Sequence, residues 1–242
     1  MLTVTHIVKK FDDIAAVNDV SFSIAPGEIF SLIGPNSSGK TTIVKSIAGL
    51  LQVNGGTIWV DGHDVAVSPK EAKAVIGYIP DEPSVWGSMT GEEFLHFVGA
   101  LYGMSPSQRV AKINELLPLF SVTGTEKDQF QNYSRGNKQK FSILAALLHE
   151  PKLLLVDEPI VGLDPESAAI AKKLFREFAK RGGAVLLVTH TLPVAEEIST
   201  RIGVLKDGAL LSVGTFDELR ERAQGEVGAT LEQVYTALTK VR

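Results

Sequence analysis

The N-terminal part of the chain alternates hydrophobic and polar residues, which is the period of a β-strand. Residues 3–8 alternate in this way, with Val4, His6 and Val8 on one face, and a second run covers 17–24. Strands with two different faces are typical of antiparallel sheets. We therefore predict an antiparallel layer at the start of the chain.

Short apolar segments bounded by turn residues predict further strands. These segments are 29–33, 57–60, 75–79, 153–156, 184–189 and 202–205. Helical spacing of apolar residues is found at 40–51, 166–181 and 192–199. This alternation of strands and helices is typical of a parallel sheet covered by helices. Asp207-Gly208 predicts a hairpin turn after the last strand, and two short helices are predicted to follow.

Within residues 91–150, apolar residues have helical spacing at 94–101, 110–117 and 141–148 and no convincing strand is found, so the segment predicts a helical insertion. We expect a single domain over 1–242, with the boundaries of its parts as follows. The core covers about 1–83 and 152–224, the helical subdomain about 84–151, and a C-terminal helix about 229–241.

Composition narrows the class of protein. Hydrophobic residues make up 44% of the 242 residues and charged residues 21%, as in a globular domain. The formal net charge of -4 argues against nucleic acid as a partner, because proteins that bind it present a basic surface. The absence of cysteine excludes disulfides and thiolate metal sites. No segment approaches the roughly 20 apolar residues of a membrane span, so we expect a cytoplasmic protein.

The segment between the strand 29–33 and the next helix fits the P-loop pattern, GxxxxGK[ST]. Glycines in such a loop let backbone N–H groups turn inward around phosphate oxygens, and the following helix adds its dipole. Lys40 is predicted to reach the β- and γ-phosphates, and the Thr41 hydroxyl to ligate Mg²⁺. The predicted nucleotide-binding residues are Gly34, Pro35, Asn36, Ser37, Ser38, Gly39, Lys40, Thr41 and Thr42.

Two further strands end in polar residues, at the edge of an α/β sheet where ligands bind. The strand 153–156 runs into Asp157 and Glu158, and His190 follows the strand 184–189. Next to a P-loop, Asp157 is predicted to hold Mg²⁺ through water, and Glu158 to be the base that orients the attacking water. His190 is predicted to contact the γ-phosphate. The predicted fold class is α/β: a P-loop NTPase core, with a mixed sheet and an antiparallel β layer, plus an inserted helical subdomain.

The order of these motifs resembles the nucleotide-binding subunit of an ABC transporter over essentially the whole chain. Tyr133-Ser134-Arg135-Gly136-Asn137 stands where the family has its signature sequence, just before the strand that ends in Asp157. Gly162-Leu163-Asp164-Pro165 matches the D-loop, and His190 matches the switch histidine. The signature at this spacing separates the family from other P-loop proteins.

The resemblance implies roles for residues outside the P-loop. Phe11 matches the aromatic residue that stacks on adenine, a contact that tolerates different bases. The signature residues, with Ser134 and Gly136 foremost, face the ATP bound to the other subunit in this family, where a helix begins and offers N–H groups to an anion. The resemblance therefore implies an ATP-dependent two-fold dimer with two ATP molecules at its interface. The signature set is Ser134, Arg135, Gly136 and Asn137, and the D-loop residue is Asp164.

The sequence departs from the family pattern in three segments. Asp81 follows Gly77-Tyr78-Ile79-Pro80, where the family typically has glutamine. A carboxylate there can bind Mg²⁺ or its water but lacks the amide donor, so the expected metal ligands are Thr41, Asp157 and Asp81. Arg135 replaces the first glycine of the commonest signature and adds a positive charge near the interface. Ser37-Ser38 replaces the usual Gly-Ala or Gly-Ser, a mild change.

The resemblance implies a subunit that hydrolyses ATP, with Lys40, Glu158 and His190 as catalytic residues and ATP and Mg²⁺ as cofactors. A separate transmembrane permease is the implied partner, and it would hold the chain at the inner face of the cell membrane. Asp81, the Tyr-Ser-Arg-Gly segment and Thr230–Tyr235 are similar to bacterial exporters of drugs, antibiotics or polysaccharides. The alternative is a soluble family member acting on the ribosome or DNA, although such proteins usually carry two domains or a long coiled coil. A regulatory module without turnover is a further alternative, against which Glu158 argues.

The segment Glu82–Met89 is a candidate partner surface. Val85, Trp86 and Met89 are apolar, but the segment is too short and too broken by Gly and Pro to form core. We expect it to form the groove that receives a cytoplasmic helix of the permease, with Trp86 as the anchor. The alternative is that Trp86 folds back onto the neighbouring helices.

Overall fold

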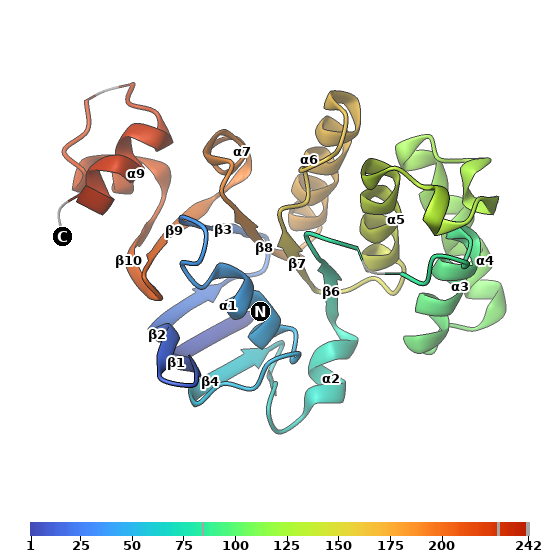
Figure 1. Cartoon of the computed structure of the whole chain (residues 1–242), viewed down its shortest axis with the longest axis horizontal. Helices are drawn as coiled ribbons and strands as arrows, with labels where there is room; N and C mark the ends of the chain where they lie inside the picture. The colour runs from blue at the N-terminus through green and yellow to red at the C-terminus, as the bar shows by residue number, and fades with distance from the viewer. Residues whose placement is uncertain (84, 227, 241–242) are drawn as a thin grey trace.

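Two β-sheets organise the chain in the computed structural model, which describes residues 1–83, 85–226 and 228–240 (Figure 1). The four-stranded sheet has the order β2-β1-β4-β5, and the six-stranded sheet has the order β10-β9-β3-β8-β7-β6. The strands are β1 (Leu2–Phe11), β2 (Ile14–Ile24), β3 (Ile29–Ile33), β4 (Gly55–Val60), β5 (His63–Asp64), β6 (Ile76–Ile79), β7 (Leu153–Asp157), β8 (Ala184–Thr189), β9 (Arg201–Lys206) and β10 (Ala209–Gly214). The four-stranded sheet is antiparallel, whereas β9, β3, β8, β7 and β6 pair in parallel and β10 joins β9 as an antiparallel hairpin. The mixed sheet and the antiparallel layer of the predicted fold class are confirmed.

Helices lie between the parallel strands and after the last hairpin. The α-helices are α1 (Lys40–Ile47), α2 (Pro69–Ala74), α3 (Gly91–Leu101), α4 (Pro106–Leu116), α5 (Arg135–Leu147), α6 (Pro165–Lys180), α7 (Leu192–Ile198), α8 (Phe216–Arg222) and α9 (Leu231–Lys240). Three short 3₁₀ turns occur at Leu117–Phe120, Thr125–Lys127 and Phe130–Asn132. Parallel strands need such crossover connections, because a short turn can join only antiparallel neighbours.

The central strands β3, β7 and β8 are buried at every position, so they are mostly apolar instead of alternating; Ser31 and the terminal residues Asp157 and Thr189 are the polar exceptions. Leu153 and Leu155 of β7 face a core shared with α1 and the four-stranded sheet. Leu154 and Val156 face a second core, shared with α6 and the helical segment between β6 and β7. The helix α1 therefore lies between the two sheets, and its packing in this core holds the preceding P-loop in place.

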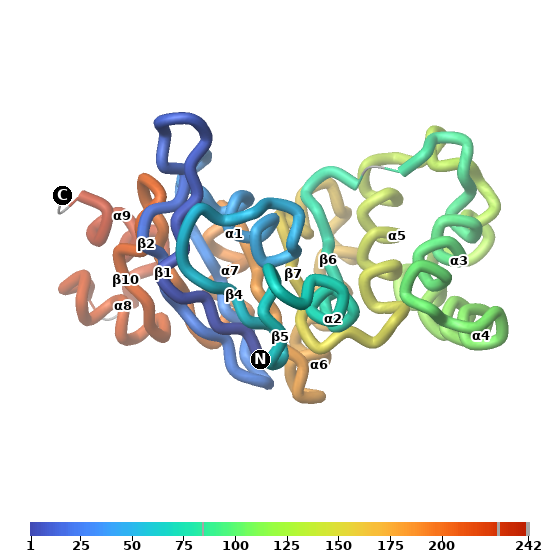
Figure 2. The backbone as a smooth tube through the Cα atoms, turned by 90° about the horizontal axis from the view of Figure 1, so that it is seen from below, coloured from blue at the N-terminus to red at the C-terminus, as the bar shows by residue number. Residues whose placement is uncertain are grey.

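The helices α3, α4 and α5 form a group beside the sheets, on the right in Figures 1 and 2. The rings of Phe130, Tyr133 and Phe141 pack against one another in this group, with one pair stacked, one edge to face and one tilted. The described residues between Gly91 and Glu150 contain no strand, as predicted. The predicted domain boundaries stay predictions, and residue 241 of the predicted C-terminal helix lies outside the described residues.

The predicted alternation in the first strand is wrong at His6. A β-bulge lies between Val4 and Ile7, where the register with β2 shifts and His6 adopts a φ of 49°. The N–H of His6 donates to the Ser21 hydroxyl at 2.8 Å, and Ile7 turns into the core instead. A bulge inserts one residue and reverses the faces beyond it, which alternation alone does not reveal.

The predicted helix 40–51 is also too long. It ends at Ile47, and Gly49 then adopts a φ of 65°. A left-handed glycine just after the last turn is the usual way a helix stops. The apolar residues at 50 and 51 belong to the loop that follows, and the Leu50 side chain is exposed.

Candidate active site

A cavity of about 520 Å³ lies at the ends of β3, β7 and β8. The lining residues come from the P-loop, from the ends of these strands and from the signature segment. They are Ala16, Asn36, Ser37, Gly39, Lys40, Thr41, Thr42, Asp81, Arg135, Asp157, Glu158, Val161 and His190. The structure thus brings together eleven residues that the sequence singled out, and adds Ala16 and Val161.

Strand register explains this convergence. Ile33 of β3 pairs with Thr189 of β8, and Asp157 of β7 pairs with Val188. Because the strands are parallel, their carboxyl ends lie at one edge of the sheet. The P-loop, Asp157 and His190 therefore meet there, although they are far apart in sequence.

Two glycines of the P-loop are required by close backbone contacts. A Cβ on Gly34 would lie 2.2 Å from the Leu205 carbonyl oxygen, and one on Gly39 would lie 2.4 Å from that of Ala16. Gly39 also has a φ of 102° and caps α1 without a side-chain hydrogen bond. The first N–H groups of α1 are therefore available to an anion. The Ser38 hydroxyl is buried without a hydrogen-bond partner among the described residues, which suits a phosphate or water ligand.

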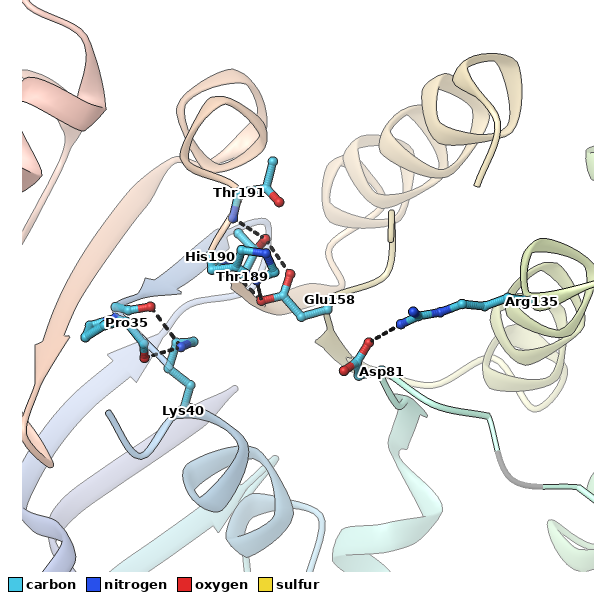
Figure 3. Close-up of polar contacts among 9 residues, drawn as sticks. Pro35, Lys40, Asp81, Arg135, Glu158, Thr189, His190 and Thr191 are labelled. Atoms are coloured by element: carbon cyan, nitrogen blue, oxygen red, sulfur yellow. Dashed lines mark hydrogen bonds and ion pairs between the residues drawn. The ribbon is translucent and has the colours of Figure 1, made fainter. Parts of the chain in front are cut away.

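Lys40 points back across the loop. Its ammonium donates to the carbonyl oxygens of Gly34 at 2.9 Å and Pro35 at 2.8 Å (Figure 3). Burial lowers the pKa of this ammonium, and the carboxylates of Glu158 and Asp157 oppose that effect. Lys40 is thus a buried cation whose partners are neutral carbonyls, and phosphate oxygens would satisfy it better.

Asp157 is 2% exposed at the end of β7. Burial raises its pKa to about 6; nearby Glu158 and Asp81 also raise it, whereas a hydrogen bond from Thr41 and the charge of Lys40 lower it. A cation bound beside this carboxyl would stabilise its ionised form and lower its pKa.

Glu158 is held in a strained but well-bonded conformation. Its φ is 48°, and its N–H donates to the Val188 carbonyl at 2.9 Å. One carboxylate oxygen accepts from the Thr189 hydroxyl at 2.9 Å, and the other accepts from the His190 N–H at 2.7 Å (Figure 3). His190 Nδ1 lies 2.6 Å from that same oxygen. Glu158 and His190 are therefore joined by two contacts at the carboxyl end of β8, and we call them the Glu158–His190 unit. The sequence motifs did not predict a role for Thr189, although it directly precedes His190.

The donor set fits Mg²⁺. Thr41 offers a hydroxyl and Asp157 and Asp81 offer carboxylates, which are the oxygen ligands this ion prefers. The described residues contain no group of three or more His, Cys, Asp or Glu that could hold a metal alone. In proteins, Mg²⁺ is usually held by one or two carboxylates together with phosphates and water.

Other predicted residues lie apart from the cavity lining. Phe11 is at the tip of the β1–β2 hairpin, which projects at the top of Figure 2; the residue is 46% exposed, and the Lys9 ammonium lies 5.0 Å from the centre of its ring. Ser134 caps α5 by accepting from the Asn137 N–H at 3.1 Å. Asp164 caps α6 by accepting from the Ser167 N–H at 2.8 Å.

The two charged departures from the family pattern are paired. Arg135 donates to Asp81 at 3.0 Å, and both side chains are about half exposed (Figure 3). The carboxylate at the usual glutamine position thus contacts the arginine at the usual glycine position of the signature.

The fold and the cavity define a P-loop ATPase. Comparison with known proteins narrows the class, since residues 17–161 match the family model described as ABC transporter. The chain is 33% identical over 226 residues to the linearmycin resistance ATP-binding protein LnrL of Bacillus subtilis (strain 168), covering 93% of this chain and 73% of that one. It is 33% identical to the transporter ATP-binding protein EcsA of the same organism, over 99% of this chain and 97% of that one. A solved structure described as an ATP-binding subunit of an ABC transporter superposes with a TM-score of 0.93 at 32% identity, over 99% of both chains.

The chain belongs to the ABC transporter family, as an ATP-binding subunit with ATPase activity. In the described ranges, no helix has the length and apolar character needed to cross a bilayer.

Asp157 provides a pH test. The pKa of Asp157 in the fold, about 6, lies above the ordinary 3.8. The folded chain therefore loses stability as pH rises from about 4 to about 6, because the buried carboxyl must ionise. Asp157→Asn should therefore raise the free energy of unfolding of the nucleotide-free chain above about pH 6, by at most about 3 kcal/mol, and have little effect below about pH 4. Urea unfolding across this range measures the difference. The exposed Asp13→Asn is the control, and an equal effect of both variants at every pH would contradict the assignment.

Proposed function

We propose that the cavity binds Mg-ATP and that its hydrolysis drives export through a separate membrane permease. The observation that carries this proposal is the joint position of Lys40 and the Glu158–His190 unit at one sheet edge, beside a P-loop. A buried cation for phosphates and a fixed carboxylate for water are the two groups that phosphoryl transfer to water needs.

In this proposal each residue has a distinct task. Lys40 leaves the Gly34 and Pro35 carbonyls to neutralise the β- and γ-phosphates. Thr41, Asp157 and Asp81 hold Mg²⁺, which when bound neutralises charge on the phosphates. Glu158, oriented by Thr189 and the His190 N–H, accepts a proton from the attacking water. His190 contacts the γ-phosphate. The P-loop residues Gly34–Thr42 surround the phosphates and offer them backbone N–H groups, except at Pro35, which has none, and Phe11 stacks on the base.

We propose further that the working form is a dimer. Ser134, Gly136 and Asn137 lie at the start of α5, where helix N–H groups can face an anion, here the ATP of a partner subunit. Asp164 lies in the D-loop directly before α6. A monomer then has half of each site, and a two-fold pair completes both.

The permease partner is supported by an apolar surface on the helical group. Trp86 is 66% exposed, and its ring meets that of Phe97 of α3 edge to face at 5.5 Å. Leu101 of the same helix is also exposed. Such a patch is typical of a protein interface. Ser84 of the predicted segment Glu82–Met89 lies outside the described residues. The partner would hold the chain at the cytoplasmic face of the membrane.

The export direction rests on the resistance function in the name of one relative and on the exporter-like segments of the sequence. The alternative of a soluble protein acting on the ribosome or DNA is not favoured by these relatives. The net charge of -4 also argues against nucleic acid.

Two substitutions separate binding from hydrolysis. Lys40→Ala removes the cation that neutralises bound phosphates, so it should lose ATP affinity and remain monomeric. Glu158→Gln removes the base and a negative charge near the γ-phosphate, so ATP should stay bound while turnover falls by about 10²–10⁴-fold. Gel filtration with Mg-ATP and a phosphate-release assay measure both effects. Normal turnover by a folded Glu158→Gln would remove Glu158 from the catalytic residues, and His190 and Asp81 would be the next candidates.

The partner surface can be tested at its aromatic anchor. Trp86→Ala should weaken co-purification with the permease and reduce transport, because it removes the largest exposed apolar side chain of the patch. Trp59→Ala, at the other tryptophan, is the matched control: it is 44% exposed but lies on β4 of the four-stranded sheet. Unchanged complex formation by a stably folded Trp86→Ala would show that the permease binds elsewhere.

A further inference from the structure

The first two turns of α5 contact two loops of the core at the edge of the cavity. Arg135 pairs with Asp81, which follows β6, and Lys140 pairs with Asp164 of the D-loop at 3.3 Å. The Gln139 amide donates to the Pro80 carbonyl at 3.5 Å. The contacts at 80 and 81 connect the helical group to the loop that lines the proposed metal site.

Arg135 reaches Asp81 by lying across the D-loop. A Cβ on Gly162 would be 3.0 Å from the Arg135 Cδ, and one on Gly136 would be 2.7 Å from the Gly162 carbonyl oxygen. The backbones of the signature and the D-loop are therefore packed against each other within one subunit. The guanidinium passes over the glycine and enters the subunit's own cavity.

We propose that Arg135 is a positioning residue: its ion pair with Asp81 restrains the helical group in the nucleotide-free subunit, and Mg-ATP opens the pair. This inference rests on the proposed function, because Asp81 lies in the cavity assigned to Mg-ATP. A metal ion there competes with Arg135 for the carboxylate, and phosphates compete with Asp81 for the guanidinium. Both side chains are about half exposed, and ion pairs of this kind are weak enough for such competition to break.

The two departures from the family pattern then compensate each other. An arginine at this place would be an unpaired cation beside the cavity if residue 81 were neutral. A carboxylate at 81 without Arg135 would add to the negative charge of Asp157 and Glu158. Together they supply, within one subunit, an electrostatic link between the loop after β6 and the start of the signature helix.

The absence of cysteine in the chain allows a direct distance measurement that leaves the pair intact. Spin labels are attached to cysteines at Asn114 of α4 and Glu71 of α2, both exposed. Pulsed electron paramagnetic resonance then gives the distribution of distances between the helical group and the core. The nucleotide-free chain should show one narrow distribution.

Arg135→Gln and Asp81→Asn should each broaden this distribution, and the double variant should broaden it no further, since both remove one interaction. Arg135→Lys keeps the charge and should restore much of the narrow form. Lys138→Gln is the matched control, because it removes a charge from the same helical turn at a residue that makes no ion pair within the described structure. No broadening by either single variant, or additive broadening in the double variant, would overturn the restraint.

Mg-ATP is then added to the labelled chain carrying Glu158→Gln, diluted with an excess of unlabelled chain so that distances between two subunits of a dimer do not contribute, and ATP binding is measured separately by equilibrium dialysis. Loss of the narrow distribution on binding supports opening of the pair. If Mg-ATP binds and the distribution stays as it was, the inference fails and the proposed function stands. If Mg-ATP does not bind, the proposed function fails together with the inference.

Discussion

The position of every group in the candidate site depends on the parallel pairing of β3, β8 and β7. The pairing makes the P-loop, Asp157 and the Glu158–His190 unit leave the sheet at the same edge, within reach of one ligand. The helix α1 and the four-stranded sheet fill one face, and α6 and the helical group fill the other. The loops at that edge are thus held by cores on both sides.

The P-loop and the sheet edge around the cavity concentrate features that stability alone would not select. Lys40 and Asp157 are buried charges, Glu158 has a left-handed backbone, and the Ser38 hydroxyl lacks a partner among the described residues. Each carries a cost that a bound metal and phosphates would reduce. Such costs gathered at one place are typical of an active site.

The fold was largely predictable from the sequence, because the strands around the site are apolar runs and the P-loop has a fixed pattern. Irregularities within single elements were not predictable. The bulge at His6 and the early end of α1 at Ile47 depend on single backbone conformations that periodicity does not encode. Within the candidate site, the motifs indicated Lys40 and Glu158, whereas the Thr189–Glu158 hydrogen bond and the Asp81–Arg135 ion pair depend on how distant segments pack together.

The central claim is that one catalytic site is built from the P-loop side of one subunit and the signature of another. Ser134→Asp keeps a good helix cap but turns a carboxylate toward the partner's phosphates. Mixed with Glu158→Gln, it forms heterodimers in which one of two sites is intact. At equal mixing and random pairing, about half of the dimers are heterodimers, and about a quarter of all sites are therefore intact. If the sites act independently, the mixture of two inactive variants should regain about a quarter of the wild-type ATPase rate. No activity in the mixture, with heterodimers present, would contradict the account.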